Sequence, residues 1–150
     1  MKDLERLHII GGLNPNADAF AGTVNTDVFE VLGEGAFFLV YYGDGKGAST
    51  LTVQACDNTT PSNTTAVAFN YRSSTTFDTW GSWSTAGTAG ITVQGESNMY
   101  EVYVPAAECA SEGYGYIRAH LVESSNTAAD GVVIAGVLNP HTQPPPSLID

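Results

Sequence analysis

The stretch AFFLVYYGDGKGASTLTVQAC, residues 36–56, contains the two strongest strand patterns of the chain and indicates its fold class. Residues 36–42 are seven consecutive apolar or aromatic residues, a pattern typical of a strand that is buried on both faces. Residues 50–56 alternate instead, which places Leu51 and Val53 on one face of a strand. Because a Gly-rich segment separates the two patterns, we expect the two strands to form a β-hairpin.

Shorter strand patterns flank this stretch and are separated by segments rich in Ser, Thr, Asn and Gly. They lie at residues 66–72, 91–93, 99–104, 114–122 and 131–138. About seven or eight short strands with turn signals between them predict an all-β fold, an antiparallel β-sandwich or jelly roll. A helical composition is confined to residues 3–8.

The length of 150 residues fits one domain with its own core. We assign residues 1–27 to an N-terminal arm, residues 28–140 to the β-sandwich domain and residues 141–150 to a Pro-rich C-terminal tail. Within the arm, residues 9–27 predict either an extended segment or a loose first strand. The arm and the tail have little hydrophobic pattern with which to pack on their own core. We therefore expect residues 9–27 to become ordered only within an assembly.

The charge balance excludes two classes of partner. The chain has 5 Lys and Arg against 16 Asp and Glu, a net charge of −11. This balance argues against nucleic-acid binding and against an anionic membrane surface, since both need basic side chains. No apolar run reaches the roughly 18 residues of a membrane helix. Charges within the first six residues predict that there is no secretory signal and that the protein is made in the cytoplasm.

The residue types that carry catalysis are sparse. His8, His120 and His141 lie in three separate segments, and no nucleophile, zinc or phosphate-binding motif is present. Carboxylates are scattered singly, although a glycosidase pair distant in sequence stays open as an alternative. We expect no enzymatic activity, no cofactor and no metal, and assign no catalytic, cofactor-binding or metal residue.

The two cysteines, Cys56 and Cys109, are too few for a disulfide scaffold or a zinc site. Without a secretory signal, two buried free thiols are favoured over a disulfide.

Five large apolar residues are candidates for a partner interface. Trp80 and Trp83 lie in a segment of Ser, Thr and Gly, and three interpretations remain open: a cap on the core, a protein interface, or a platform for sugars. The expected arm contributes Ile9, Ile10 and Leu13.

Several stretches carry a resemblance to a known family. They are TLTVQACD (50–57), AVAF (66–69), YEVYVPAAE (100–108), GYGYIR (113–118) and VVIA (132–135), followed by Asn139 and Pro140. With them, residues 49–142 resemble small virion proteins of tailed bacteriophages that are encoded near the major capsid protein. Cys109 stands where the family has Leu, which supports a buried role for that thiol, and the first 48 residues lie outside the resemblance.

The resemblance implies a non-enzymatic virion structural protein, a head decoration (cement) protein bound to the capsid exterior. Its partner would be the major capsid protein, and the protein would be a homo-oligomer, for which we favour a trimer. The acidic charge suits the outer surface of the head better than the DNA side. The alternative is a tail or head-fibre adhesin that binds host glycans through Trp80 and Trp83, and an enzyme is the third hypothesis.

Overall fold

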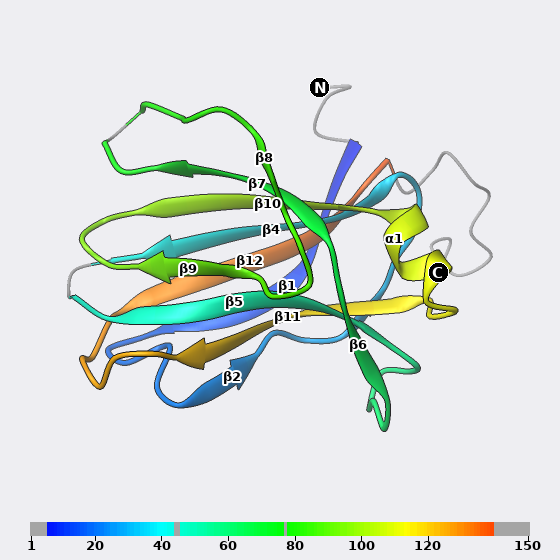
Figure 1. Ribbon diagram of the computed structural model, residues 1–150, viewed down its shortest axis with the longest axis horizontal. Helices are drawn as coiled ribbons and strands as arrows, with labels where there is room; N and C mark the ends of the chain where they lie inside the picture. Colours follow the sequence, from blue (N-terminus) through cyan, green and yellow to red (C-terminus); the bar gives the residue numbers. More distant parts are fainter. Residues whose placement is uncertain (1–5, 44–45, 77, 140–150) are drawn as a thin grey trace.

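The computed structural model describes residues 6–43, 46–76 and 78–139. Within them the chain is an all-β sandwich of two antiparallel sheets, with one short helix, α1 (Ala106–Ser111), at one end of the layers (Figure 1). These described residues form twelve strands, more than the seven or eight expected.

The first sheet, sheet A, has the strand order β1-β12-β4-β10-β7-β8. Its strands are β1 (Leu7–Asn16), β12 (Gly131–Leu138), β4 (Gly35–Tyr42), β10 (Met99–Pro105), β7 (Phe69–Ser74) and β8 (Ser84–Ala86).

The second sheet, sheet B, has the strand order β2-β11-β5-β6, with β3 also paired to β11 and β9 also paired to β5. Its strands are β2 (Thr23–Asn25), β3 (Phe29–Glu30), β5 (Ala48–Cys56), β6 (Thr64–Val67), β9 (Ile91–Gln94) and β11 (Tyr116–Glu123).

The hairpin predicted for residues 36–56 is wrong. β4 lies in sheet A and β5 lies in sheet B, so the Gly-rich connection joins two layers instead of two paired strands. Five residues, 43–47, separate the two strands, whereas the favoured hairpin turn has two. Across the interior, the Tyr42 hydroxyl donates a hydrogen bond of 2.5 Å to Ser49 Oγ, and both residues are fully buried.

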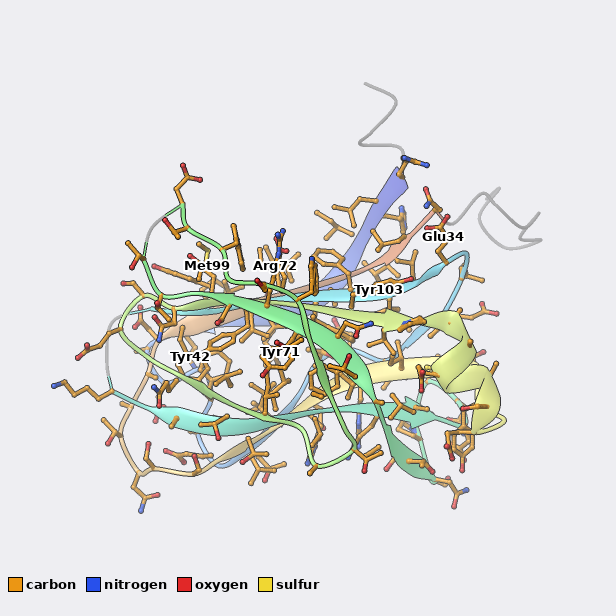
Figure 2. All side chains as sticks on the ribbon, turned by 45° about the horizontal axis from the view of Figure 1, so that its top comes forward. Glu34, Tyr42, Tyr71, Arg72, Met99 and Tyr103 are labelled. Carbon is orange, nitrogen blue, oxygen red and sulfur yellow. The ribbon has the colours of Figure 1, made fainter. Side chains whose placement is uncertain are left out.

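The core lies between the sheets and is built from alternate residues of each strand. From sheet A, Phe38 and Val40 are fully buried, and Leu51 and Val53 face them from sheet B. Figure 2 shows Tyr42 and Tyr71 between the two layers.

Phe20 closes one end of the core by stacking on Tyr42, with ring centroids 4.0 Å apart. Gly131 makes room for this stack, because a Cβ at that position would lie 2.4 Å from the Phe20 ring.

The separate arm assigned to residues 1–27 is wrong over residues 7–25, whereas the alternative of a first strand within residues 9–27 is confirmed by β1. Residues 7–16 form β1 and pair with β12, Phe20 is buried, and β2 pairs with β11. Main-chain hydrogen bonds and one aromatic anchor hold this segment, which explains why its side chains show so little periodicity.

The structure also differs from the expected secondary structure at residues 3–8 and 66–72. The helix proposed for residues 3–8 is wrong at Leu7 and His8, which belong to β1, while residues 3–5 lie outside the described residues. The single strand expected at 66–72 is split, because the chain crosses from β6 in sheet B to β7 in sheet A. The tail, residues 141–150, also lies outside the described residues.

The burial of Tyr42 predicts how stability depends on alkaline pH. Burial raises the pKa of Tyr42 from 10 to about 12. The neutral phenol therefore stabilises the fold fully below pH 10, and this contribution is lost as the pH rises through about 12. We expect the free energy of unfolding of the wild type, measured by urea denaturation, to fall between pH 10 and 12.

The Tyr42→Phe variant is expected to be about 1–3 kcal/mol less stable at pH 7, because Ser49 Oγ loses its partner, and to show a shallower alkaline decline. Parallel pH profiles for the variant and the wild type would contradict this assignment.

Candidate functional site

The outer face of sheet B is polar. Alternate residues of β5 and β11 point outward and bond to one another: Arg118 Nε donates to Gln54 Oε1 at 2.9 Å, and Thr52 Oγ1 donates to the His120 carbonyl at 3.3 Å. His120 Nδ1 lies 2.7 Å from Asn25 Oδ1, and partial burial together with the nearby Arg118 lowers the pKa of its imidazole. Such a hydrogen-bonded polar surface suits contact with water.

The outer face of sheet A is apolar. The register places Phe37 beside Tyr103 and Gly136, and Leu39 beside Ile134, on the side away from the core. Figure 2 shows Met99 and Tyr103 on this outer side of the sheet. We define the apolar face by its outward-facing members, Leu7 and Ile9 of β1, Phe37, Leu39 and Tyr41 of β4, Met99 and Tyr103 of β10, and Val132, Ile134 and Leu138 of β12.

The expectation that residues 36–42 are buried on both faces of a strand is wrong for the face that points away from the core. Phe38 and Val40 are fully buried, whereas Phe37, Leu39 and Tyr41 are half-buried, and no described layer covers them. A sandwich normally alternates inward apolar residues with outward polar ones. A broad apolar surface of this kind marks a site of interaction.

Charge is almost absent from this face. The described strands of sheet A direct two charged side chains to it, Arg72 of β7 and Glu101 of β10, and their ion pair (N···O 2.5 Å) cancels the charge. The chain as a whole carries −11. On this face Glu101 is paired with Arg72, so the surface carries little net charge, which favours docking against another macromolecule.

The two tryptophans lie on the outer side of sheet A beside the apolar face. The Arg72 guanidinium carbon lies 4.9 Å from the Trp80 ring centroid and 5.0 Å from that of Trp83. Trp83 is 51% exposed and Trp80 is half-buried, so the interpretation that both cap the core is wrong. Arg72 occupies one face of each ring, and each such stack contributes about 0.5–1 kcal/mol at an exposed site.

A groove of about 300 Å³ runs between Trp83 and the apolar face. Its apolar walls are formed by Leu7, Phe37, Trp83, Tyr103 and Leu138, with Glu34 and Glu101 adding carboxylates. The Tyr103 hydroxyl donates to the Glu34 carbonyl at 3.1 Å, which fixes one wall.

The five candidate interface residues fall in different environments. Ile9, at 60% exposure, belongs to the apolar face, and Ile10 is 41% exposed beside it. Leu13 packs partly against the core and contributes little to any outer surface. Sequence reasoning missed the outward residues of β4 and β12, although the unbroken apolar runs that contain them were the available signal.

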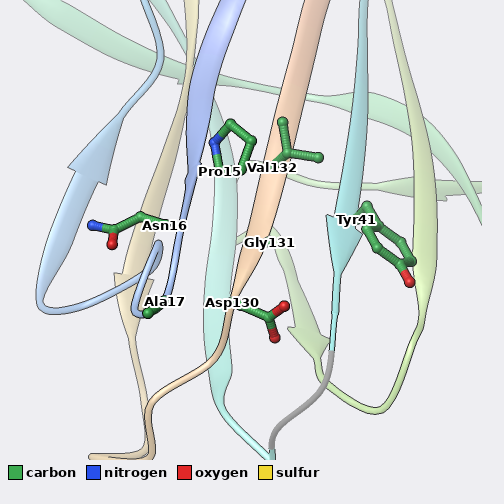
Figure 3. A pocket seen from close by; sticks show the side chains of 7 residues that line it. All are labelled: Pro15, Asn16, Ala17, Tyr41, Asp130, Gly131 and Val132. Carbon is green, nitrogen blue, oxygen red and sulfur yellow. The ribbon is translucent and has the colours of Figure 1, made fainter.

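The described residues contain no arrangement typical of an active site. A hollow of about 880 Å³ beside Tyr41 (Figure 3) is lined by a single carboxylate, Asp130, and by the Tyr41 side chain, with no second carboxylate and no His, Lys or Cys. Within these residues, no group of three or more His, Cys, Asp or Glu is placed to hold a metal ion.

Cys56 and Cys109 are free and buried, as expected. Burial raises the pKa of both thiols, that of Cys109 to about 11, so both remain protonated and unreactive near neutral pH.

No protein-family model matches the chain, and comparisons with curated proteins and with solved structures find no match either. In the part of the chain that the structure describes, no helix has the length and apolar character to span a membrane.

The stacking of both tryptophans on Arg72 can be tested with Arg72→Ala. Removing the guanidinium frees both rings, so we expect the near-ultraviolet circular dichroism of tryptophan to weaken and stability to fall by about 1 kcal/mol. Arg118→Ala is the matched control, because Arg118 bonds to Gln54 on the opposite face and contacts neither tryptophan. Equal loss of signal in the two variants would contradict the stacked arrangement.

Proposed function

We propose that the chain is a non-enzymatic structural protein of a phage virion, a capsid decoration (cement) protein that binds the outer head surface through its apolar face. The observation that supports this proposal is the difference between the two outer faces: sheet A exposes apolar side chains, and sheet B exposes hydrogen-bonded polar ones. A protein that coats a shell needs one face for the shell and one face for water.

The stabilising effect of such a protein follows from binding alone. A decoration protein that binds the assembled shell and not its free subunits shifts the equilibrium toward the shell by mass action. Burying the apolar face contributes about 25 cal/mol for each Å² of apolar surface removed from water. The polar face of sheet B would then remain toward solvent. The major capsid protein is the partner in this proposal.

The adhesin alternative depends on tryptophan rings that stack on sugars. One face of each ring is already in contact with Arg72, which leaves less aromatic surface for a glycan. The proposal therefore places Trp83 beside the docking surface for the head.

Ile134→Asp is expected to weaken binding to purified phage heads by at least about tenfold, because it buries an unpaired carboxylate against the shell. Val122→Asp is the matched control, since Val122 is also β-branched but projects from the outer face of sheet B at 40% exposure. Binding would be measured by co-sedimentation with intact heads and, separately, with tails from the same lysate. Circular dichroism would verify that each variant is folded.

Several outcomes would contradict the proposal. Equal head binding by both variants would remove the apolar face from the contact. Association with tails alone, together with loss of cell binding in Trp80→Ala, would favour the adhesin. Hydrolase activity that disappears when one carboxylate is replaced would favour an enzyme.

A further inference from the structure

The strand β1 gives sheet A an unusually long free edge. β1 has ten residues, and among the described residues it pairs with β12 only. The opposite edge of sheet A, β8, has three residues, and in sheet B the outer strands β2 and β6 have three and four. Proteins commonly protect their edges by keeping edge strands short or charged, because unpaired main-chain groups are templates for another strand. β1 is neither short nor charged, and irregularities in its pairing with β12 after Ile9 and after Leu13 leave Leu7–Ile9 as the regular part of this edge.

The hydrogen bonds around β12 show which groups of β1 point outward. The Leu138 carbonyl accepts from Glu34 N on the β4 side, and Asn139 N donates to the Arg6 carbonyl on the β1 side. The main-chain N–H and C=O groups of successive residues point to opposite sides of a strand. Those of Arg6 and His8 therefore point toward β12. Those of Leu7 and Ile9 point toward the free edge.

The outward groups of Leu7 and Ile9 are self-complementary. If two such segments run antiparallel about a two-fold axis at His8, Leu7 of each copy faces Ile9 of the other. Each of these facing pairs exchanges two main-chain hydrogen bonds, and the two His8 residues form a non-hydrogen-bonded pair between them.

The side chains favour the same contact. Leu7 and Ile9 both belong to the apolar face, so their cross-strand pairing would bury Ile9, now 60% exposed. Residues 7–9 carry no Asp, Glu, Lys or Arg, so two chains of net charge −11 would pair along uncharged segments, while the Asp27 carboxylate lies farther along β1, beside Gly11.

We propose that two copies of this chain join edge to edge, the Leu7–Ile9 segment of one β1 pairing antiparallel with the same segment of the second copy. The two copies of sheet A then form one continuous sheet, and their apolar faces form one continuous surface. This contact is two-fold and therefore differs from the trimer expected from the sequence. It does not depend on the virion function, because it requires only the free edge of β1.

Disulfide trapping with His8→Cys tests the pairing even when association is weak. In a non-hydrogen-bonded pair the two Cα atoms lie about 4.5 Å apart, within the range that a disulfide spans. Asn14→Cys is the matched control, since Asn14 is exposed on the same strand but would lie roughly 40 Å from its counterpart. The native cysteines are buried in both variants and contribute the same background.

With oxidised glutathione, we expect His8→Cys to form covalent dimers at least about ten times faster than Asn14→Cys, as measured on non-reducing gels. Adding Ile9→Pro removes an outward N–H without removing a bond to β12, and it should slow trapping about tenfold. Adding Ile9→Val, which keeps the N–H, should not. Circular dichroism would verify the fold of each variant.

The proposal is overturned if His8→Cys is trapped no faster than Asn14→Cys. It is equally overturned if Ile9→Pro and Ile9→Val give the same rate in the His8→Cys background, because main-chain pairing would then have no part in the association.

Discussion

The fold depends on β4 and β5 facing each other across the core instead of pairing within one sheet. Each is the central strand around which its own sheet is built, and the buried hydrogen bond between Tyr42 and Ser49 ties them at the point where the chain passes from one layer to the other. Once these two strands are opposed, their inward side chains must fill the space between the layers. β10, β12 and β11 then add beside them, and the remaining strands complete the two sheets.

The placement of β4 and β5 on opposite sides of the core also determines which side chains each sheet exposes. β5 alternates apolar with polar residues, so sheet B buries its apolar face in the core and exposes its polar face to water. β4 and β12 are apolar on both faces, so their outward side chains lie on the surface with nothing described above them. An apolar face on which the charges of Arg72 and Glu101 neutralise each other is unfavourable in contact with water unless another molecule covers it. This is the physical basis for treating it as a docking surface.

Local patterns in the sequence located most strands but could not assign them to sheets. Residues 131–138 were identified as a strand with the bounds that the structure shows, and the all-β class follows from such segments. Pairing depends on contacts between distant residues, so the sequence could not distinguish a hairpin at 36–56 from a crossing between layers. For residues 9–27 the sequence left an arm and a loose first strand as alternatives, because the side chains of β1 show no alternation and its pairing with β12 uses main-chain groups. At the candidate site, Ile9 and Trp83 were named as candidate interface residues and both are exposed, whereas the outward residues of β4 were assigned to an interior.

The position of the tryptophans has a practical consequence. Both of the chain's tryptophans flank Arg72 on the outer side of sheet A, and neither belongs to the core between the sheets. Their intrinsic fluorescence is therefore a label-free reporter of that one surface. A change in emission that accompanies an unchanged far-ultraviolet spectrum would signal a change in what covers sheet A, separately from any change in the fold itself.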